Sequence, residues 1–193
     1  MDGSAVVEST AKRASAGLLF HPGHVWARIH SIDLVSLGTT DFAVDFVGTL
    51  ASVSLPRESR VLRQGETAWT LVSGKRRVLS QVTPFGGMVV AVNDELIRDP
   101  GLIQRSPYDK GWLVFVRPRD ISSMMADMRS CVAYRMWLNC IRGTMPLCLN
   151  STTQPLMQEG KWVSKFGDHL TDVEWRALRR RLFPRSSDVG NAA

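Results

Sequence analysis

A short polar run between two strand-like stretches limits the possible folds of this chain more than any other feature. Residues 73–77 have the sequence Ser-Gly-Lys-Arg-Arg, and they lie between residues 67–72 and 78–82, which are rich in β-branched and other apolar residues. A glycine among polar residues, placed between two such stretches, is typical of a β-hairpin. The sequence therefore predicts a hairpin whose tip lifts one or more cations into solvent.

Further short strands are expected on both sides of this hairpin. The expected strands are residues 25–30, 34–37, 49–55, 61–62, 88–92 and 112–116. Thr40 is expected to cap a short helix that Gly48 ends, and residues 98–110 are expected to form a loop. Many short strands separated by turns favour a sandwich or a barrel over an α/β fold.

The predicted hairpin tip consists of Gly74, Lys75, Arg76 and Arg77. A lysine on a protruding hairpin can be acylated by lipoate or biotin, and the resulting arm can reach several active sites in turn. An arginine cannot form this amide, because its guanidinium group stays protonated and is a poor nucleophile. Lys75 is therefore the only attachment candidate at this tip.

Sequence motifs follow one another in a fixed order from His24 to Pro118. They are His24-Val25-Trp26, Leu37-Gly38-Thr39-Thr40-Asp41-Phe42-Ala43, Gly48, Val53-Ser54-Leu55-Pro56, Gly65-Glu66, Pro84 with Gly87, Val92-Asn93, Leu96, Pro100, Leu102, Pro107-Tyr108 and Gly111-Trp112. In this order and spacing they resemble the H protein of the glycine cleavage system, a family within the lipoyl-type domains. The resemblance implies a mainly β fold, a lipoyl-type barrel-sandwich hybrid of two small antiparallel sheets, followed here by a C-terminal helical extension.

The hairpin tip departs from the pattern of this family, in which the lysine lies in a Glu-Ser-Val-Lys-Ala segment. Counting forward from Gly65 places the family lysine at Lys75, whereas counting back from Pro84 places it at Arg76. The hairpin therefore holds one extra residue. Val72 also stands where the family has a glutamate, and two arginines follow the lysine directly.

These departures favour an interaction module without lipoate, related to the glycine cleavage system, whose basic tip docks on an anionic protein surface. The alternative is a lipoylated carrier that shuttles an aminomethyl group between glycine cleavage enzymes through Lys75, as the resemblance implies. Lipoate on Lys75 is the only cofactor expected, and the expected partners are proteins. No nucleophile elbow or phosphate-binding glycine loop is present, so an independent enzyme is not expected.

Charge, cysteine and histidine spacing, and the length of apolar runs limit the partners, metal sites and compartment expected for this chain. The net charge of +6 and the isoelectric point near 9.7 favour an acidic partner. The cysteines, Cys131, Cys140 and Cys148, form no Cys-x-x-Cys pair, which argues against a zinc site or a disulfide framework and favours the cytoplasm. No histidine set has metal-ligand spacing. No apolar run is long enough for a signal peptide core or a membrane span.

The chain is expected to have three parts: a mobile tail over residues 1–19, a lipoyl-type domain over 20–118, and a C-terminal extension over 119–193. In the extension, apolar residues at helical spacing predict one amphipathic helix from about 120 to 141, ended by Gly143. Its stripe is Ile121, Met125, Met128, Val132 and Met136, widened by Met124, Leu138 and Ile141. We expect this stripe to pack on the β domain, on the last helix or on a second copy in a homo-oligomer.

The last predicted helix has a clear start and end. Thr171 with Glu174 three residues later forms a capping box, and Pro184 follows the last helical turn. A basic cluster lies on this helix and just beyond it, formed by Arg176, Arg179, Arg180, Arg181 and Arg185. Cations near a helix C-terminus are favourable, and no aromatic residues alternate with these arginines, so a solvated helix face is favoured over a nucleic-acid site.

Overall fold

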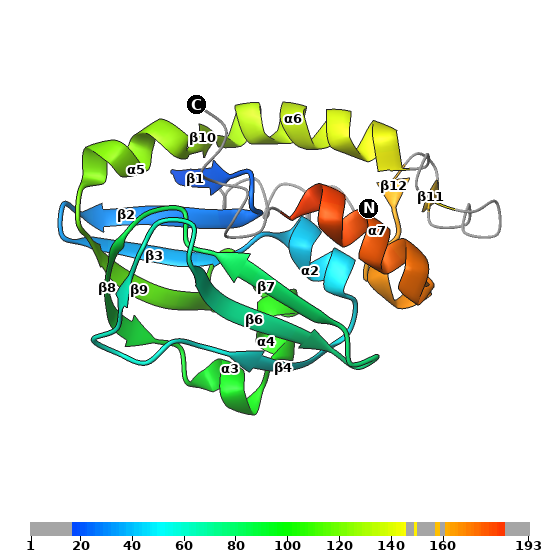
Figure 1. Cartoon of the computed structure of the whole chain (residues 1–193), viewed down its shortest axis with the longest axis horizontal. Helices are drawn as coiled ribbons and strands as arrows, with labels where there is room; N and C mark the ends of the chain where they lie inside the picture. The colour runs from blue at the N-terminus through cyan, green and yellow to red at the C-terminus, as the bar shows by residue number, and fades with distance from the viewer. Residues whose placement is uncertain (1–16, 146–148, 150–156, 159–160, 184–193) are drawn as a thin grey trace, which may run out of the picture.

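Two antiparallel sheets form the body of the protein (Figure 1). The computed structural model describes residues 17–145, 149, 157–158 and 161–183. The larger sheet contains β1 (Leu18–His21), β2 (Val25–Ser31), β3 (Leu34–Thr39), β5 (Val61–Leu62), β8 (Gly87–Val92), β9 (Trp112–Pro118) and β10 (Arg129–Ser130). The smaller sheet contains β4 (Leu50–Ser54), β6 (Thr67–Ser73) and β7 (Val78–Val82).

The strand orders are β10-β1-β2-β3-β9-β8-β5 in the larger sheet and β4-β6-β7 in the smaller one. One continuous cluster of buried apolar side chains joins the two sheets, with Trp26 and Leu37 from the larger sheet and Trp69 and Leu79 from the smaller. The expected mainly β fold with two antiparallel sheets is therefore confirmed. The hairpin of β6 and β7 is also confirmed, with Val72 opposite Val78.

Short helices fill the connections of the β body. Helix α2 (Asp41–Val47) begins at Thr40, whose side chain accepts a hydrogen bond from Ala43 N, and ends at Gly48 with φ 85°. Helices α3 (Glu95–Arg98) and α4 (Gly101–Arg105) connect β8 to β9. The loop predicted over 98–110 is thus wrong in part, because burial of Ile103 holds α4 in place although its own sequence is a weak helix former.

The single long helix predicted over 120–141 is wrong. The structure has α5 (Ile121–Asp127) and α6 (Cys131–Thr144), separated by β10. Strand β10 pairs with Leu19 and Phe20 of β1, and the Ser130 side chain then caps α6 by accepting a hydrogen bond from Ala133 N. Pairing with a sheet edge thus outweighs continuous helical periodicity. Helix α6 also continues through Gly143 to Thr144.

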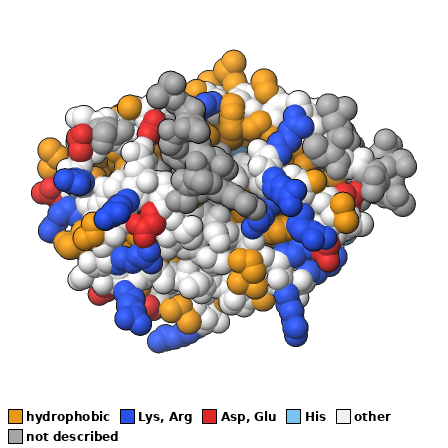
Figure 2. Space-filling view, in the orientation of Figure 1, with side chains coloured by type: hydrophobic (Ala, Val, Ile, Leu, Met, Phe, Trp, Pro, Cys, Tyr) orange, Lys and Arg blue, Asp and Glu red, His pale blue; other side chains and the backbone are white. Residues whose placement is uncertain are grey.

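The predicted packing of the apolar stripe is confirmed in part. Several of its members lie in the core or pack against it, namely Met124, Leu138, Ile121, Met128 and Ile141. Val132 and Met136, by contrast, are 69% and 67% exposed, and Figure 2 shows hydrophobic side chains gathered over α6. Because β10 separates α5 from α6, the stripe does not continue along one helix, and only part of it faces the body. Packing of the exposed part against a second copy stays a prediction.

The C-terminal extension is joined closely to the β body. Helix α6 lies along β1, and η3 (Phe166–His169) lies against α2, followed by α7 (Asp172–Leu182) (Figure 1). Strands β11 (Met157–Gln158) and β12 (Lys161–Trp162) form a separate antiparallel pair. At the other end of the chain, β1 begins two residues inside the tail predicted over 1–19 and buries Leu18, while residues 1–16 lie outside the described part.

Candidate functional site

The β6–β7 hairpin ends in a three-residue loop, Gly74, Lys75 and Arg76. Ser73 N donates to Arg77 O over 2.9 Å, and Arg76 N donates to Ser73 O over 2.8 Å. Arg76 has φ 60°, as the third residue of this common loop requires, although a side chain makes that conformation costly. The extra residue of this hairpin is thus accommodated at its tip, with both strands intact.

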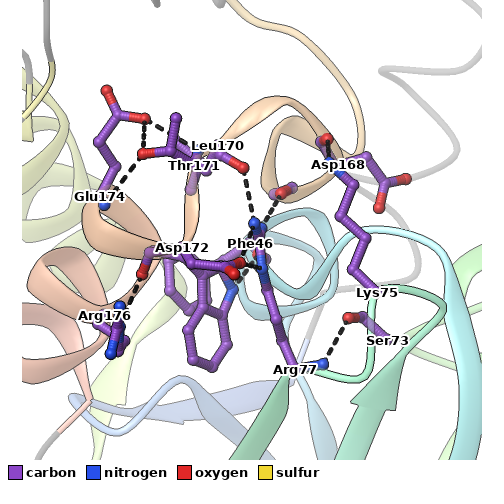
Figure 3. Close-up of polar contacts among 12 residues, drawn as sticks. Phe46, Ser73, Lys75, Arg77, Asp168, Leu170, Thr171, Asp172, Glu174 and Arg176 are labelled. Atoms are coloured by element: carbon purple, nitrogen blue, oxygen red, sulfur yellow. Dashed lines mark hydrogen bonds and ion pairs between the residues drawn. The ribbon is translucent and has the colours of Figure 1, made fainter.

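Lys75 is exposed at the tip, but its amine is not free. Its Nζ donates a hydrogen bond to the backbone carbonyl of Asp168, in η3 of the C-terminal extension (Figure 3). The carboxylate of Asp168 accepts hydrogen bonds from Thr49 N over 2.9 Å and from Thr49 Oγ1 over 2.7 Å. Thr49 O in turn accepts a hydrogen bond from Gly74 N over 2.8 Å. Asp168 and Thr49 therefore tie η3 to the loop that carries Lys75.

The prediction that the tip lifts one or more cations into solvent is confirmed for Lys75 and Arg76, whereas Arg77 is buried. Its guanidinium donates to Gly167 O over 2.8 Å and to Leu170 O over 2.7 Å. Nε and Nη2 also donate to one carboxylate oxygen of Asp172, over 2.9 and 2.7 Å (Figure 3). The planar donors of arginine suit such a set of acceptors, and the hydrogen bonds offset the cost of burying the charge.

The elements next to Arg77 let the C-terminal extension approach closely. A Cβ on Gly167 would lie 1.9 Å from Phe46 O, and one on Gly48 would lie 2.2 Å from Asp168 Oδ1. The Trp175 ring stacks on Phe46 with centroids 5.2 Å apart and donates from Nε1 to Phe46 O over 3.3 Å. Two glycines and one aromatic pair thus seat residues 164–183, which we call the C-terminal segment, against α2 and the hairpin.

The capping box predicted for the last helix is confirmed. Thr171 Oγ1 accepts from Glu174 N over 3.3 Å, and Thr171 N donates to the Glu174 carboxylate over 2.9 Å. This cap places Asp172 in the first turn of α7, facing Arg77. Hydrogen bonding and charge from Arg77 lower the pKa of Asp172. The carboxylate therefore stays ionised and keeps the pair with Arg77 at neutral pH.

The basic cluster of α7 lies on the outer side of this segment. Figure 2 shows Lys and Arg side chains gathered over α7. Arg176 and Arg180 are exposed, and Arg179 packs over the Trp175 ring at 5.7 Å. Arg185 lies outside the described residues.

A pocket of about 430 Å³ lies between α2, α4 and the start of the C-terminal segment. Its wall includes Asp45, whose Oδ1 accepts hydrogen bonds from Lys165 N over 2.9 Å and from Ser164 Oγ over 3.1 Å. Burial raises the pKa of Asp45 above its usual value, against these two hydrogen bonds, which lower it. Arg105 also lines the pocket. The pocket therefore has charges of both signs and is closed on one side by the C-terminal segment.

A buried histidine lies among aromatic rings of α2, α6 and the C-terminal segment. His24 Nδ1 lies 2.7 Å from Tyr134 Oη, and the His24 ring packs against Phe42, Trp137 and Phe183. Burial lowers the pKa of His24 to about 3, and burial likewise lowers the pKa of His21 to about 4. His24 is thus a neutral core residue.

The four predicted tip residues therefore separate into two groups. Gly74, Lys75 and Arg76 are exposed at the loop, whereas Arg77 is buried under the C-terminal segment. The sequence reasoning missed Asp168 and the acceptors of Arg77, which lie about ninety residues further along the chain. Only the capping box at Thr171 hinted that a defined structure begins there.

Other kinds of site find no support in the part of the chain that the structure describes. No group of three or more His, Cys, Asp or Glu side chains there could hold a metal ion. None of the helices in these residues has the length and apolar character needed to cross a membrane.

Comparison with known proteins places this geometry in a family. The family model described as glycine cleavage H-protein matches residues 18–138. A glycine cleavage system H protein of Coprothermobacter proteolyticus is 32% identical over 122 residues, covering 63% of this chain and 94% of that protein. One from Hydrogenovibrio crunogenus is 37% identical over 119 residues, covering 61% of this chain and 90% of that protein.

A solved structure supports the same conclusion. The crystal structure of a glycine cleavage system H protein from Mycobacterium marinum matches with a TM-score of 0.58 and 26% identity, covering 64% of this chain and 97% of that one. The matched part contains both sheets and the hairpin, and the family match ends before the C-terminal segment. The chain therefore belongs to the glycine cleavage H-protein family.

Proposed function

We propose that this protein is a lipoyl carrier of the glycine cleavage system, with Lys75 as its attachment residue. Proteins of this family are carriers and not independent enzymes, and they carry lipoate on a lysine. The observation that supports the assignment is the exposed position of Lys75 in the loop of an intact β6–β7 hairpin. Arg76 and Arg77, its neighbours, cannot form the amide.

The surroundings of Lys75 fit an acylated amine. An amide at Nζ would keep one N–H, so the hydrogen bond to Asp168 O could be retained after acylation, whereas the positive charge would be lost. The two strands hold the loop, so the chain presents the arm from a defined point, and tethering raises its concentration at each partner site. The bound lipoyl group would supply the redox and group-carrying chemistry. The partners would be the glycine cleavage enzymes.

A second candidate is a protein interaction module that carries no lipoate. The contacts that favour it are those of the tip itself, because Lys75 donates to Asp168 and Arg77 is fully engaged by the C-terminal segment. In such a module the cations would serve to hold the extension in place. The altered register and the arginines beside Lys75 agree with this role.

Intact mass separates the two functions. We expect natively expressed protein, supplied with lipoate, to carry the mass of one lipoyl group, with the modification on the peptide that contains Lys75. Lys75→Arg should abolish it, while Lys110→Arg, at an exposed lysine outside the hairpin, should not. Unmodified protein under lipoate supply, or a lipoyl group on the Lys75→Arg variant, would contradict the carrier assignment.

A further inference from the structure

The C-terminal segment covers the one lysine that the carrier function needs. Acylation requires the neutral amine of Lys75 to turn its lone pair toward an activated acyl group. In the structure the amine instead faces Asp168 O as a hydrogen-bond donor. While the segment lies on the tip, an acyl donor would have to displace this contact before it could react.

The segment is anchored in the core by apolar side chains such as Phe166 and Leu170, whereas its contacts with the hairpin tip itself are polar. Arg77 reaches two carbonyls of the segment, at Gly167 and Leu170, and one carboxylate, at Asp172. The Arg77 side chain is 8% exposed, whereas that of Asp172 is 75% exposed. The ionic part of the contact is therefore open to solvent, where salt screens it. Such a contact can open without unfolding the body.

The segment is an addition to the part of the chain that the family shares. The family match ends at residue 138, and the Coprothermobacter relative is covered over 94% of its own length by 63% of this chain. The two arginines after Lys75 and the presence of this segment therefore occur together in one chain, and the structure joins them through Arg77 and Asp172.

We propose that the C-terminal segment is a releasable cover of Lys75, held by Arg77, and that its release controls how fast the amine can be acylated. In the closed arrangement Asp168 O holds the amine and Arg77 is satisfied by the segment. In the open arrangement the Lys75 amine is released from Asp168 O. The consequence for lipoylation rests on the proposed function, whereas the cover itself does not.

Limiting chemical acylation of the full chain tests the cover without any lipoate enzyme. The protein is treated with a small amount of an acetyl succinimidyl ester, and the modified peptides of Lys75 and of the exposed Lys110 are quantified over time. We expect Lys75 in the unaltered chain to react more slowly than Lys110. Asp172→Asn and Arg77→Met should each raise the Lys75 rate by about threefold or more, because reactivity follows the open fraction. The Lys110 rate should not change.

The matched control is Asp33→Asn, which removes the same charge from the turn between β2 and β3. It should leave the Lys75 rate unchanged, and circular dichroism should show that all variants are folded at the labelling temperature. Equal rates at Lys75 and Lys110 in the unaltered chain, or an unchanged Lys75 rate in both tip variants, would overturn the cover.

A second measurement separates this inference from the proposed function. The same variants are incubated with a lipoate ligase, lipoate and ATP. Faster lipoylation of Asp172→Asn supports both. Absence of lipoylation in every variant, with faster chemical acylation of Lys75, would remove the carrier function and leave the cover standing. If Lys75 is lipoylated but neither its lipoylation rate nor its acylation rate changes in the variants, the cover is wrong and the carrier function stands.

Discussion

The C-terminal extension is attached to the β body in two different ways. Helix α6 is attached through aromatic and apolar side chains, with Tyr134 stacked on Phe20 at 4.8 Å and close to His24. The C-terminal segment combines aromatic contacts with Phe46, made by Trp175, Phe166 and Phe183, with a set of hydrogen bonds at the hairpin tip. Apolar burial contributes mainly stability, whereas the polar contacts select one position and can open separately.

The largest effect is expected from the aromatic contacts with Phe46. Trp175→Ala should lower the free energy of unfolding by about 3–5 kcal/mol, because it removes a buried ring that stacks on Phe46. Urea denaturation monitored by circular dichroism measures it. Val173→Ala, on the same helix but 69% exposed, should have little effect. Equal stability of both variants would show that the segment contributes nothing to the core.

The hydrogen bonds of Arg77 should contribute less to the free energy of unfolding than the Trp175 ring does. Arg77→Met keeps much of the side-chain volume but leaves Gly167 O and Leu170 O without their donor. We expect a loss of about 1.5–3 kcal/mol, the usual cost for hydrogen bonds to a charged group. Arg76→Met, at the exposed neighbour in the same loop, should leave the unfolding midpoint unchanged. A similar loss in both variants would mean that the loop, not the segment, is affected.

Acid should weaken the part of the body where His21 and His24 are buried. The ordinary pKa of a histidine is about 6.5. Burial opposes the positive charge and lowers the pKa to about 4 for His21 and to about 3 for His24. Between these pKa values the unfolded chain binds more protons than the folded protein. The contribution of the two neutral histidines to the free energy of unfolding is therefore complete above about pH 6.5 and is lost as the pH falls below it. Each histidine contributes a slope of up to about 1.4 kcal/mol per pH unit.

His24→Asn tests this dependence, because His24 has φ 59° and asparagine tolerates this conformation without titrating. Urea midpoints at pH 7, 6 and 5 should fall less steeply for the variant than for the unaltered chain. Parallel curves would show that His24 is protonated in the folded protein at these pH values.

The smallest effect on stability is expected for Asp172→Asn. The carboxylate is largely exposed, and the amide oxygen of asparagine can still accept from Arg77. The melting temperature should therefore stay close to that of the unaltered chain, although Lys75 becomes more reactive. A large fall in melting temperature would place Asp172 among the groups that stabilise the fold and would weaken the distinction between the two kinds of attachment.

Local spacing in the sequence determined the elements and the family. The β-rich stretches around residues 73–77 predict the hairpin, Thr40 and Gly48 bound α2, and the pair Thr171 and Glu174 marks the start of α7. Each of these depends on hydrogen bonds between residues only a few positions apart, so the residue types at fixed spacing carry the information. The ordered motifs from His24 to Pro118 then identify the family fold.

Only the tertiary structure decided how the tip is used. Arg77 has the same sequence appearance as Arg76, yet one is buried and the other exposed. The difference comes from acceptors at Gly167, Leu170 and Asp172, and contacts over such a separation leave no periodic pattern in a single sequence. The break between α5 and α6 also depends on residues far apart in the sequence. Arg129 and Ser130 pair with the edge of β1, although the spacing of apolar residues around them is helical.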